Sequence, residues 1–175
     1  MLSSLVWPVA AGKSFPAIPE PTGDPIATTR PDTEASRPIV LLVEDNLFDV
    51  KVISRALQQC GLELDLQIST QGEHALSLLS GLDAGIQHRP PSLILLDWNL
   101  PMVSGSEVLG YIRQNDRLKT IPVVVVTSTD SPADLSEIRR LGANAHFRKS
   151  TDLDAYLNLN TLVVDLMSRP QKALS

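Results

Sequence analysis

Three short runs of consecutive apolar residues constrain the fold of this 175-residue chain more than any other feature. They are IVLLV at Ile39–Val43, LILL at Leu93–Leu96 and VVVV at Val123–Val126. Runs of four or five residues without polar alternation are typical of strands that are buried on both faces, as in a parallel sheet. Two weaker strands are predicted at Asp65–Ser69 and Asn144–Phe147. Helices must then cover both faces of one sheet.

The segments between and after the strands carry apolar residues at helical spacing. Ser131-Pro132 is a start signal for the fourth helix and Gly142 is its stop signal. The strictly alternating order of strands and helices predicts a doubly wound α/β fold with right-handed crossovers. The expected helical stripes are Leu47, Val50, Ser54 and Leu57; Leu76, Leu78 and Leu79; Val108, Leu109 and Ile112; Leu135, Ile138 and Leu141; and Leu153, Tyr156, Leu157, Val163 and Met167.

Prolines divide the chain into a tail and a folded domain. Seven of the 13 prolines lie in the first 38 residues, where the apolar residues follow no helical or strand spacing. We expect residues 1–37 to form a disordered Pro-rich tail, residues 38–168 to form the domain and residues 169–175 to form a short C-terminal tail. The apolar stretch Leu5–Ala11 is short and no basic residue precedes it, so it does not fit a signal peptide. We therefore expect a cytoplasmic location.

The composition excludes several classes of function. The chain has 20 acidic and 15 basic residues and a net charge of −5, which argues against bulk electrostatic binding to nucleic acid or anionic membranes. Cys60 is the single cysteine, so an internal disulfide and a Cys-rich zinc site are both excluded. No run approaches the 18 apolar residues of a membrane span.

Polar side chains follow the predicted strands at their carboxyl ends. Glu44 and Asp45 follow the first strand, and Asp97 follows the third. Thr127 follows the fourth strand, and Lys149 lies near the end of the fifth. Open α/β sheets bind ligands at this edge, near the point where the order of the strands in the sheet reverses. With the strand order 2-1-3-4-5, the three carboxylates would crowd together, and Mg²⁺ suits such oxygen ligands. Each residue alone could simply end a strand or cap a helix, but their joint placement favours a site.

Four segments in this order resemble the receiver domain of bacterial two-component response regulators: LLVEDNLFDV, LILLDWNLPMVSG, VVVVTS and LGANAHFRKS. The resemblance covers about residues 38–168 and implies a flavodoxin-like sheet with the strand order 2-1-3-4-5. The LVEDN opening, the extended loop before the third strand and the K-S ending are most similar to the stand-alone regulators that accompany bacterial and cyanobacterial phytochromes.

The resemblance implies a role for each of the three carboxylates at the strand ends and for Asn99. Asp97 would accept a phosphoryl group from a histidine kinase. Asp45 and Asp97 would ligate Mg²⁺ directly, Glu44 would hold it through water, and Asn99 would offer its backbone carbonyl. The protein is then a signalling protein and not an enzyme, apart from self-catalysed phosphoryl transfer to Asp97 and slow hydrolysis from it.

The remaining implied roles concern the phosphoryl oxygens and the switch. Lys149 would pair with one oxygen, and Thr127 would donate its hydroxyl to another. The backbone N–H of Trp98 or Ser128 could add a further donor. In the family, an aromatic side chain three residues before the lysine fills the space that the threonine leaves. His146 occupies that position here, so we expect either a switch residue or a surface residue.

The resemblance also implies how the signal leaves the domain. The face of the fourth helix, fifth strand and fifth helix, about residues 131–168, is the expected output or dimer surface. Residues 151–168 carry more apolar side chains than one helix face needs, which favours an exposed homodimer patch over a wide core stripe. The expected partners are a sensor histidine kinase, of which a phytochrome is one candidate, or a phosphotransfer protein. A single-domain regulator is expected, with no direct contact to nucleic acid or membrane.

Two other functions fit parts of the sequence. A phosphatase of the haloacid-dehalogenase type needs an aspartate two residues after its nucleophile, and Asn99 occupies that place. A receiver-like interaction module that is never phosphorylated usually lacks the acidic pair, the aspartate or the lysine, and all are present here. Whether the Lys149–Ser150 peptide bond is cis stays open, because the family's usual K-P is replaced by K-S.

Overall fold

The computed structural model describes residues 37–85 and 89–168. Nearly all of the expected N-terminal tail and all of the expected C-terminal tail lie outside these residues. The described residues form five strands and five α-helices in alternation, with one short 3-10 turn before the last helix. Their bounds are β1 Ile39–Val43, α1 Leu47–Gln58, β2 Asp65–Ser69, α2 Gly72–Asp83, β3 Leu93–Asp97, α3 Gly105–Gln114, β4 Val123–Thr127, α4 Pro132–Arg140, β5 Ala145–Arg148, η1 Leu153–Ala155 and α5 Tyr156–Ser168.

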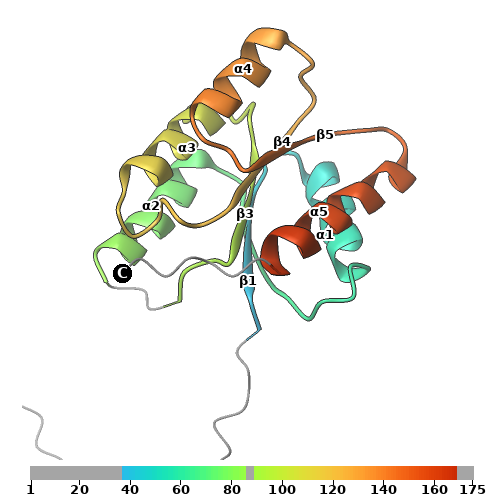
Figure 1. Cartoon of the computed structure of the whole chain (residues 1–175), viewed down its shortest axis with the longest axis horizontal. Helices are drawn as coiled ribbons and strands as arrows, with labels where there is room; N and C mark the ends of the chain where they lie inside the picture. Colours follow the sequence, from blue (N-terminus) through green and yellow to red (C-terminus); the bar gives the residue numbers. More distant parts are fainter. Residues whose placement is uncertain (1–36, 86–88, 169–175) are drawn as a thin grey trace, which may run out of the picture. The chain divides into compact units, whose positions relative to one another are not determined.

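The five strands form one parallel sheet in the order β2-β1-β3-β4-β5, as expected. In Figure 1, α1 and α5 lie on one side of the sheet, and α2, α3 and α4 lie on the other. Consecutive residues of a strand point to opposite faces. Val40 and Leu42 therefore pack toward α1 and α5, whereas Leu41 and Val43 pack toward the other three helices. Burial on both faces explains why β1, β3 and β4 consist almost entirely of consecutive apolar residues.

The strand ends differ slightly from those that the apolar runs predict. β3 and β4 each continue through one polar residue, because Asp97 and Thr127 still pair with neighbouring strands. β5 begins and ends one residue later than predicted, at Ala145 and Arg148. Asn144 is outside the strand because its side chain accepts hydrogen bonds of 2.8 Å from the Val123 N–H and from Arg113.

Helix α1 corrects one predicted stripe. Leu47 was expected on the buried face, but it is 65% exposed, and the buried residues begin at Val50. Only three residues separate the end of β1 from the start of the helix. Its first turn therefore lies at the carboxyl edge of the sheet and not over the sheet. Asn46 caps this turn, because its Oδ1 accepts a 2.9 Å hydrogen bond from the Phe48 N–H.

The apolar residues of α5 are mainly core residues. Tyr156, Leu159, Val163 and Leu166 are buried against α1 and the sheet. Leu157 is the large apolar side chain of the described part of α5 that is exposed, at 56%. The wide stripe thus serves mostly to cover the sheet. Of the expected exposed patch, Leu157 is exposed, and Leu162, Val164 and Met167 are half-buried. Homodimerisation stays a prediction. No helix in the two described stretches is both long and apolar enough to cross a membrane.

Candidate functional site

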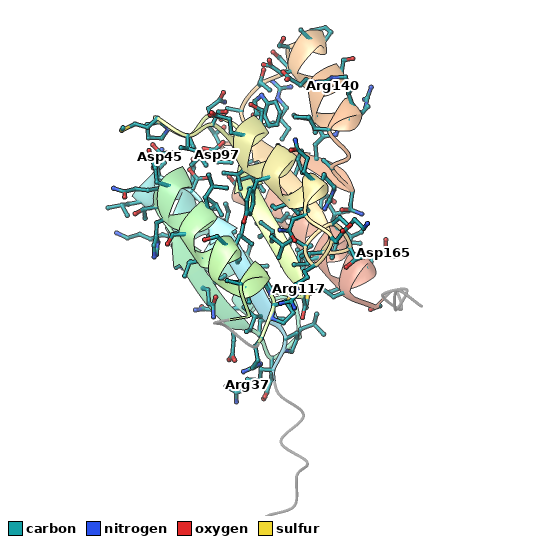
Figure 2. The ribbon with its side chains drawn as sticks, turned by 90° about the vertical axis from the view of Figure 1, so that its left-hand side faces the viewer. Arg37, Asp45, Asp97, Arg117, Arg140 and Asp165 are labelled. Carbon is teal, nitrogen blue, oxygen red and sulfur yellow. The ribbon has the colours of Figure 1, made fainter. Side chains whose placement is uncertain are left out.

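The polar residues at the strand ends meet at one edge of the sheet. β1 and β3 are neighbours, so Glu44 and Asp45 lie beside Asp97. Figure 2 shows Asp45 and Asp97 together at the same end of the sheet. Thr127 ends the next strand, β4, and the Lys149 N–H donates a 2.8 Å hydrogen bond to its carbonyl oxygen. The parallel ladder therefore assembles residues that are up to 105 positions apart in the chain (from 44 to 149).

Three carboxylates form a group that could hold a metal ion. One oxygen from each of Glu44, Asp45 and Asp97 lies within 4.8 Å of the others. Glu44 is fully buried and Asp97 is nearly so, whereas Asp45 is exposed and opens the group to solvent. Backbone donors orient two of them: the Asn46 N–H bonds to Glu44 at 3.2 Å, and the Asn99 N–H bonds to Asp97 at 3.1 Å. Clustered, pre-oriented hard oxygens fit a divalent cation such as Mg²⁺.

A single ammonium lies against these carboxylates. Lys149 Nζ is 2.7 Å from Glu44 Oε2 and 3.0 Å from Asp97 Oδ2. It also lies 2.9 Å from Asp49 Oδ2, a contact that the sequence did not predict. The Lys149 side chain is only 9% exposed, so these contacts are poorly screened by water. One positive charge is thus shared among three negative groups.

Burial and charge shift two of these groups in opposite senses. Burial, with a smaller contribution from the nearby Asp97 charge, raises the pKa of Glu44 to about 7 against the opposing effect of Lys149. Burial alone would lower the pKa of Lys149, but its hydrogen bonds to Glu44, Asp49 and Asp97 outweigh this and raise it. At neutral pH the lysine is therefore charged, and Glu44 is poised between its two protonation states.

Asp49 is the site residue that sequence reasoning missed. It lies in the first turn of α1, which starts at the same sheet edge as the carboxylates. The available signal was an acidic residue at the start of the helix that follows the first strand, because that helix begins at the edge where the strand ends. The predicted stripe of this helix did not include Asp49, and the long-range partner, Lys149, is 100 residues away.

The loop after β4 surrounds Thr127. Thr127 is fully buried, and its Oγ1 accepts a 3.1 Å hydrogen bond from the Thr129 N–H. Thr129 Oγ1 in turn donates to Asp134 at 2.7 Å, which ties this loop to the start of α4. Ser128 between them is exposed, and Trp98 beside Asp97 is buried.

Strand β5 places two aromatic rings on opposite faces. His146 is exposed and pairs with Val125, whose side chain faces α2, α3 and α4. Phe147 is buried on the other face, with its ring centroid 5.2 Å from that of Tyr156. The exposure of His146 agrees with a surface residue, and its role as a switch stays a prediction. The Lys149–Ser150 peptide bond that follows is trans.

Glycine at position 105 fixes the main chain beside Asp97. Gly105 begins α3, and a Cβ at this position would collide with the Asp97 carbonyl oxygen and come within 2.8 Å of the Trp98 Cα. The Gly105 N–H donates a 3.2 Å hydrogen bond to the Trp98 carbonyl oxygen. Ser104 and Glu107 form a capping box at the same helix end. This packing holds the segment after β3 against the strand that carries Asp97.

Comparison with known proteins identifies relatives of this arrangement. A family model described as the response regulator receiver domain matches residues 40–159. Response regulator Rcp1 of Synechocystis is 36% identical over 115 residues, which cover 66% of this chain and 78% of Rcp1. The probable methanogenesis regulatory protein FilR2 of Methanothrix harundinacea is 38% identical over 117 residues, which cover 66% of this chain and 75% of FilR2.

Two solved structures share the fold and about a third of the aligned residues. The phosphorylated cyanobacterial phytochrome response regulator RcpA has a TM-score of 0.68 and 30% identity, and the match covers 75% of this chain and 94% of RcpA. The Mn²⁺-bound form of Rcp1 has a TM-score of 0.63 and 33% identity, and the match covers 79% of this chain and 97% of Rcp1.

Proposed function

This chain belongs to the response regulator receiver domain family, a family of signalling proteins, and we propose that Asp97 accepts a phosphoryl group from a histidine kinase in a Mg²⁺-dependent reaction. One observation carries the proposal. The Asp97 carboxylate ends β3 at the sheet edge, 3.0 Å from the Lys149 ammonium and within the 4.8 Å group that includes Glu44 and Asp45. A nucleophile, a cationic partner and a cation-binding group thus meet at one point.

The chemistry follows from the placement of these groups. An Asp97 oxygen forms a bond to phosphorus as the bond from phosphorus to the donor atom breaks, and the donor leaves with the electron pair. Glu44, Asp45, Asp97 and the Asn99 backbone carbonyl are the proposed Mg²⁺ ligands, with Glu44 acting through water. The bound cation would neutralise charge on the phosphoryl oxygens, which dominates catalysis of such transfers.

The remaining groups would bind the other phosphoryl oxygens. Lys149 provides a point charge, and the backbone N–H of Trp98 or Ser128 provides a hydrogen bond. The bond that Thr127 accepts from Thr129 uses an oxygen lone pair. The Thr127 O–H hydrogen can therefore be donated to a phosphoryl oxygen. Movement of Thr127 would shift the loop to α4, because Thr129 links this loop to Asp134.

The relatives support a proposal for the partners. RcpA is described as a cyanobacterial phytochrome response regulator, and we place this chain in a similar pathway. The phosphoryl donor would be a sensor histidine kinase, with a phytochrome as a candidate, or a phosphotransfer protein. The output surface would be the face of α4, β5 and α5, with His146 as the switch ring and homodimerisation as one form of output.

Phosphorylation can be tested with a small phosphodonor. Wild-type protein incubated with Mg²⁺ and acetyl phosphate should gain the mass of one phosphoryl group, and chelation of Mg²⁺ should abolish the gain. Asp97→Asn should remain unmodified. Asp116→Asn is the matched control, because this exposed carboxylate pairs only with Lys119 among the contacts of the described residues. An adduct retained in Asp97→Asn would refute the assignment of the acceptor. An unmodified wild type would favour the interaction module that is never phosphorylated.

A further inference from the structure

The Lys149 ammonium has one carboxylate partner that does not belong to the proposed cation group. Asp49 Oδ2 accepts a 2.9 Å hydrogen bond from Lys149 Nζ. The oxygens that converge within 4.8 Å come from Glu44, Asp45 and Asp97, and Asp49 is not among them. Two partners of the lysine are thus shared with the cation, and the third is not.

Asp49 is held by a different element from the other partners. It lies in the first turn of α1, and the next turns of this helix are fixed by the buried residues Val50 and Ile53. The N-terminal end of a helix favours a negative charge, and Asp49 occupies that end of α1. Its side chain is only 18% exposed. The carboxylate is therefore a fixed negative charge on the side of Lys149 that the helix occupies.

A bound cation would change the surroundings of the lysine. A dication at the oxygen group would attract Glu44 and Asp97 and so weaken their attraction to Lys149. The same dication would repel the ammonium, and this repulsion would be strong where little water screens it. Asp49 lies outside the oxygen group, so its carboxylate could offset the repulsion and keep the ammonium in place.

We propose that Asp49 is a positioning residue, which holds the Lys149 ammonium beside Asp97 when the carboxylate group binds Mg²⁺, so that the lysine meets the incoming phosphoryl group. This inference rests on the proposed phosphoryl transfer to Asp97. The three carboxylate partners of the lysine then have two separate roles. Glu44 and Asp97 bind the cation, whereas Asp49 keeps its ion pair with Lys149.

The packing around Asp49 supports this role. Tyr156 of α5 is buried, and its ring contacts Phe147 of β5. Burial raises the pKa of the Tyr156 hydroxyl, and the Asp49 charge raises it further. The side chains of Lys149 and Asp49 are only 9% and 18% exposed, and this reduced access of water strengthens the attraction between them.

The test measures binding of beryllium fluoride, a phosphoryl mimic, to Mg²⁺-saturated protein through Trp98 fluorescence. A Trp7→Phe background assigns the signal to Trp98. Asp49→Asn should weaken beryllium fluoride binding by about tenfold, the order expected for loss of one charged hydrogen bond. Glu73→Gln is the matched control, because it removes an exposed charge from the first turn of α2 at the same sheet edge. It should change the affinity by less than about twofold.

Action through Lys149 is tested by a double-mutant cycle. In a Lys149→Gln background, Asp49→Asn should have an effect of less than about twofold, because the ammonium that it positions is gone. Asp49→Glu keeps the charge but moves it by one methylene, so its affinity should lie between those of the wild type and Asp49→Asn. Circular dichroism checks that each variant is folded.

Three results would overturn the inference. They are an unchanged or tighter affinity in Asp49→Asn, an equal loss in the Lys149→Gln background, and an Asp49→Glu protein as weak as Asp49→Asn. In each case a wild type that still responds leaves the proposed phosphorylation of Asp97 standing. A wild type that neither binds beryllium fluoride nor gains mass with acetyl phosphate overturns both proposals.

Discussion

Asp97 is held from two sides by different interactions. On one side, its carboxylate contacts Lys149, which follows β5 and also contacts Glu44 and Asp49. Toward α3, its main chain packs against Gly105 at a distance that leaves no room for a side chain. Ion pairs can exchange partners when a cation or a phosphoryl group arrives, whereas close backbone packing cannot. The site thus combines a rearrangeable charged side with a rigid packed side, and four predictions test this contrast.

The largest effect is expected on the charged side. Lys149→Met keeps the apolar part of the side chain but leaves the Glu44 and Asp97 carboxylates buried without the ammonium that pairs with them. The free energy of unfolding should fall by about 3 kcal/mol at pH 8 in the presence of a chelator. Urea denaturation measures it. Lys119→Met is the control, because its ammonium pairs with an exposed carboxylate, and the expected loss is below about 1 kcal/mol. Equal losses in the two variants would show that the buried cluster has no special role.

The packed side should respond to shape and not to charge. Gly105→Ala places a methyl group against the Asp97 carbonyl and should destabilise the protein by about 2 kcal/mol. The loss should be the same at pH 6 and pH 8, with or without Mg²⁺. Gly110→Ala in the same helix is the control, since its new Cβ would meet only a Gln114 side-chain atom at 3.9 Å. Higher helix propensity should stabilise that variant by about 0.5–1 kcal/mol. A pH-dependent loss in Gly105→Ala would break the distinction between the sides.

The charged side should also depend on pH. The folded pKa of Glu44 is raised from 4.5 to about 7, so the metal-free folded state binds more protons than the unfolded state between these values. Stability of the metal-free protein should therefore fall as pH rises through this window. Mg²⁺ binding requires the ionised carboxylate, so the apparent Mg²⁺ affinity should fall about tenfold from pH 8 to pH 6. Calorimetry measures it, and Glu44→Gln should flatten the profile. A steep profile retained in Glu44→Gln would assign the titration to another group.

The smallest effect is expected at the exposed ring of β5. His146→Ala removes a solvent-exposed side chain and should change the free energy of unfolding by less than about 0.5 kcal/mol. Phe147→Leu, on the buried face, should cost about 1 kcal/mol. Thermal unfolding compares the two. If His146 is the switch ring, His146→Ala should alter the response of partners to beryllium fluoride without altering stability. A large loss of stability would contradict its placement on the surface.

The strands β1, β3 and β4 were predictable because their residues are buried on both faces of the sheet, whereas the edge strands β2 and β5 are partly exposed. Ile39–Val43 and Asp65–Ser69 match the observed β1 and β2. β3 and β4 run one residue further than predicted, since Asp97 and Thr127 keep their backbone pairing although their side chains are polar. Leu47 was misplaced because apolar periodicity specifies a face of the helix but not how far the sheet extends beneath it.

The site residues at strand ends were predictable from the sequence, whereas the site residue on a helix was not predicted. Glu44, Asp97 and Lys149 follow strands, so a parallel sheet brings them to one edge. Asp49 has no such marker, because an acidic residue in a first helical turn is common for electrostatic reasons alone. Only the position of α1 over β1 shows that this carboxylate faces the lysine.

The sequence by itself determined the fold class, the edge at which chemistry is placed and the family resemblance, because apolar runs and strand-end residues are local features. The tertiary structure alone decided that Glu44 is fully buried while Asp45 is exposed. It also decided that one ammonium serves three carboxylates and that the apolar residues of α5 mostly cover the sheet. Burial, pKa and ion pairing depend on which distant segments meet, and no local pattern encodes those distances.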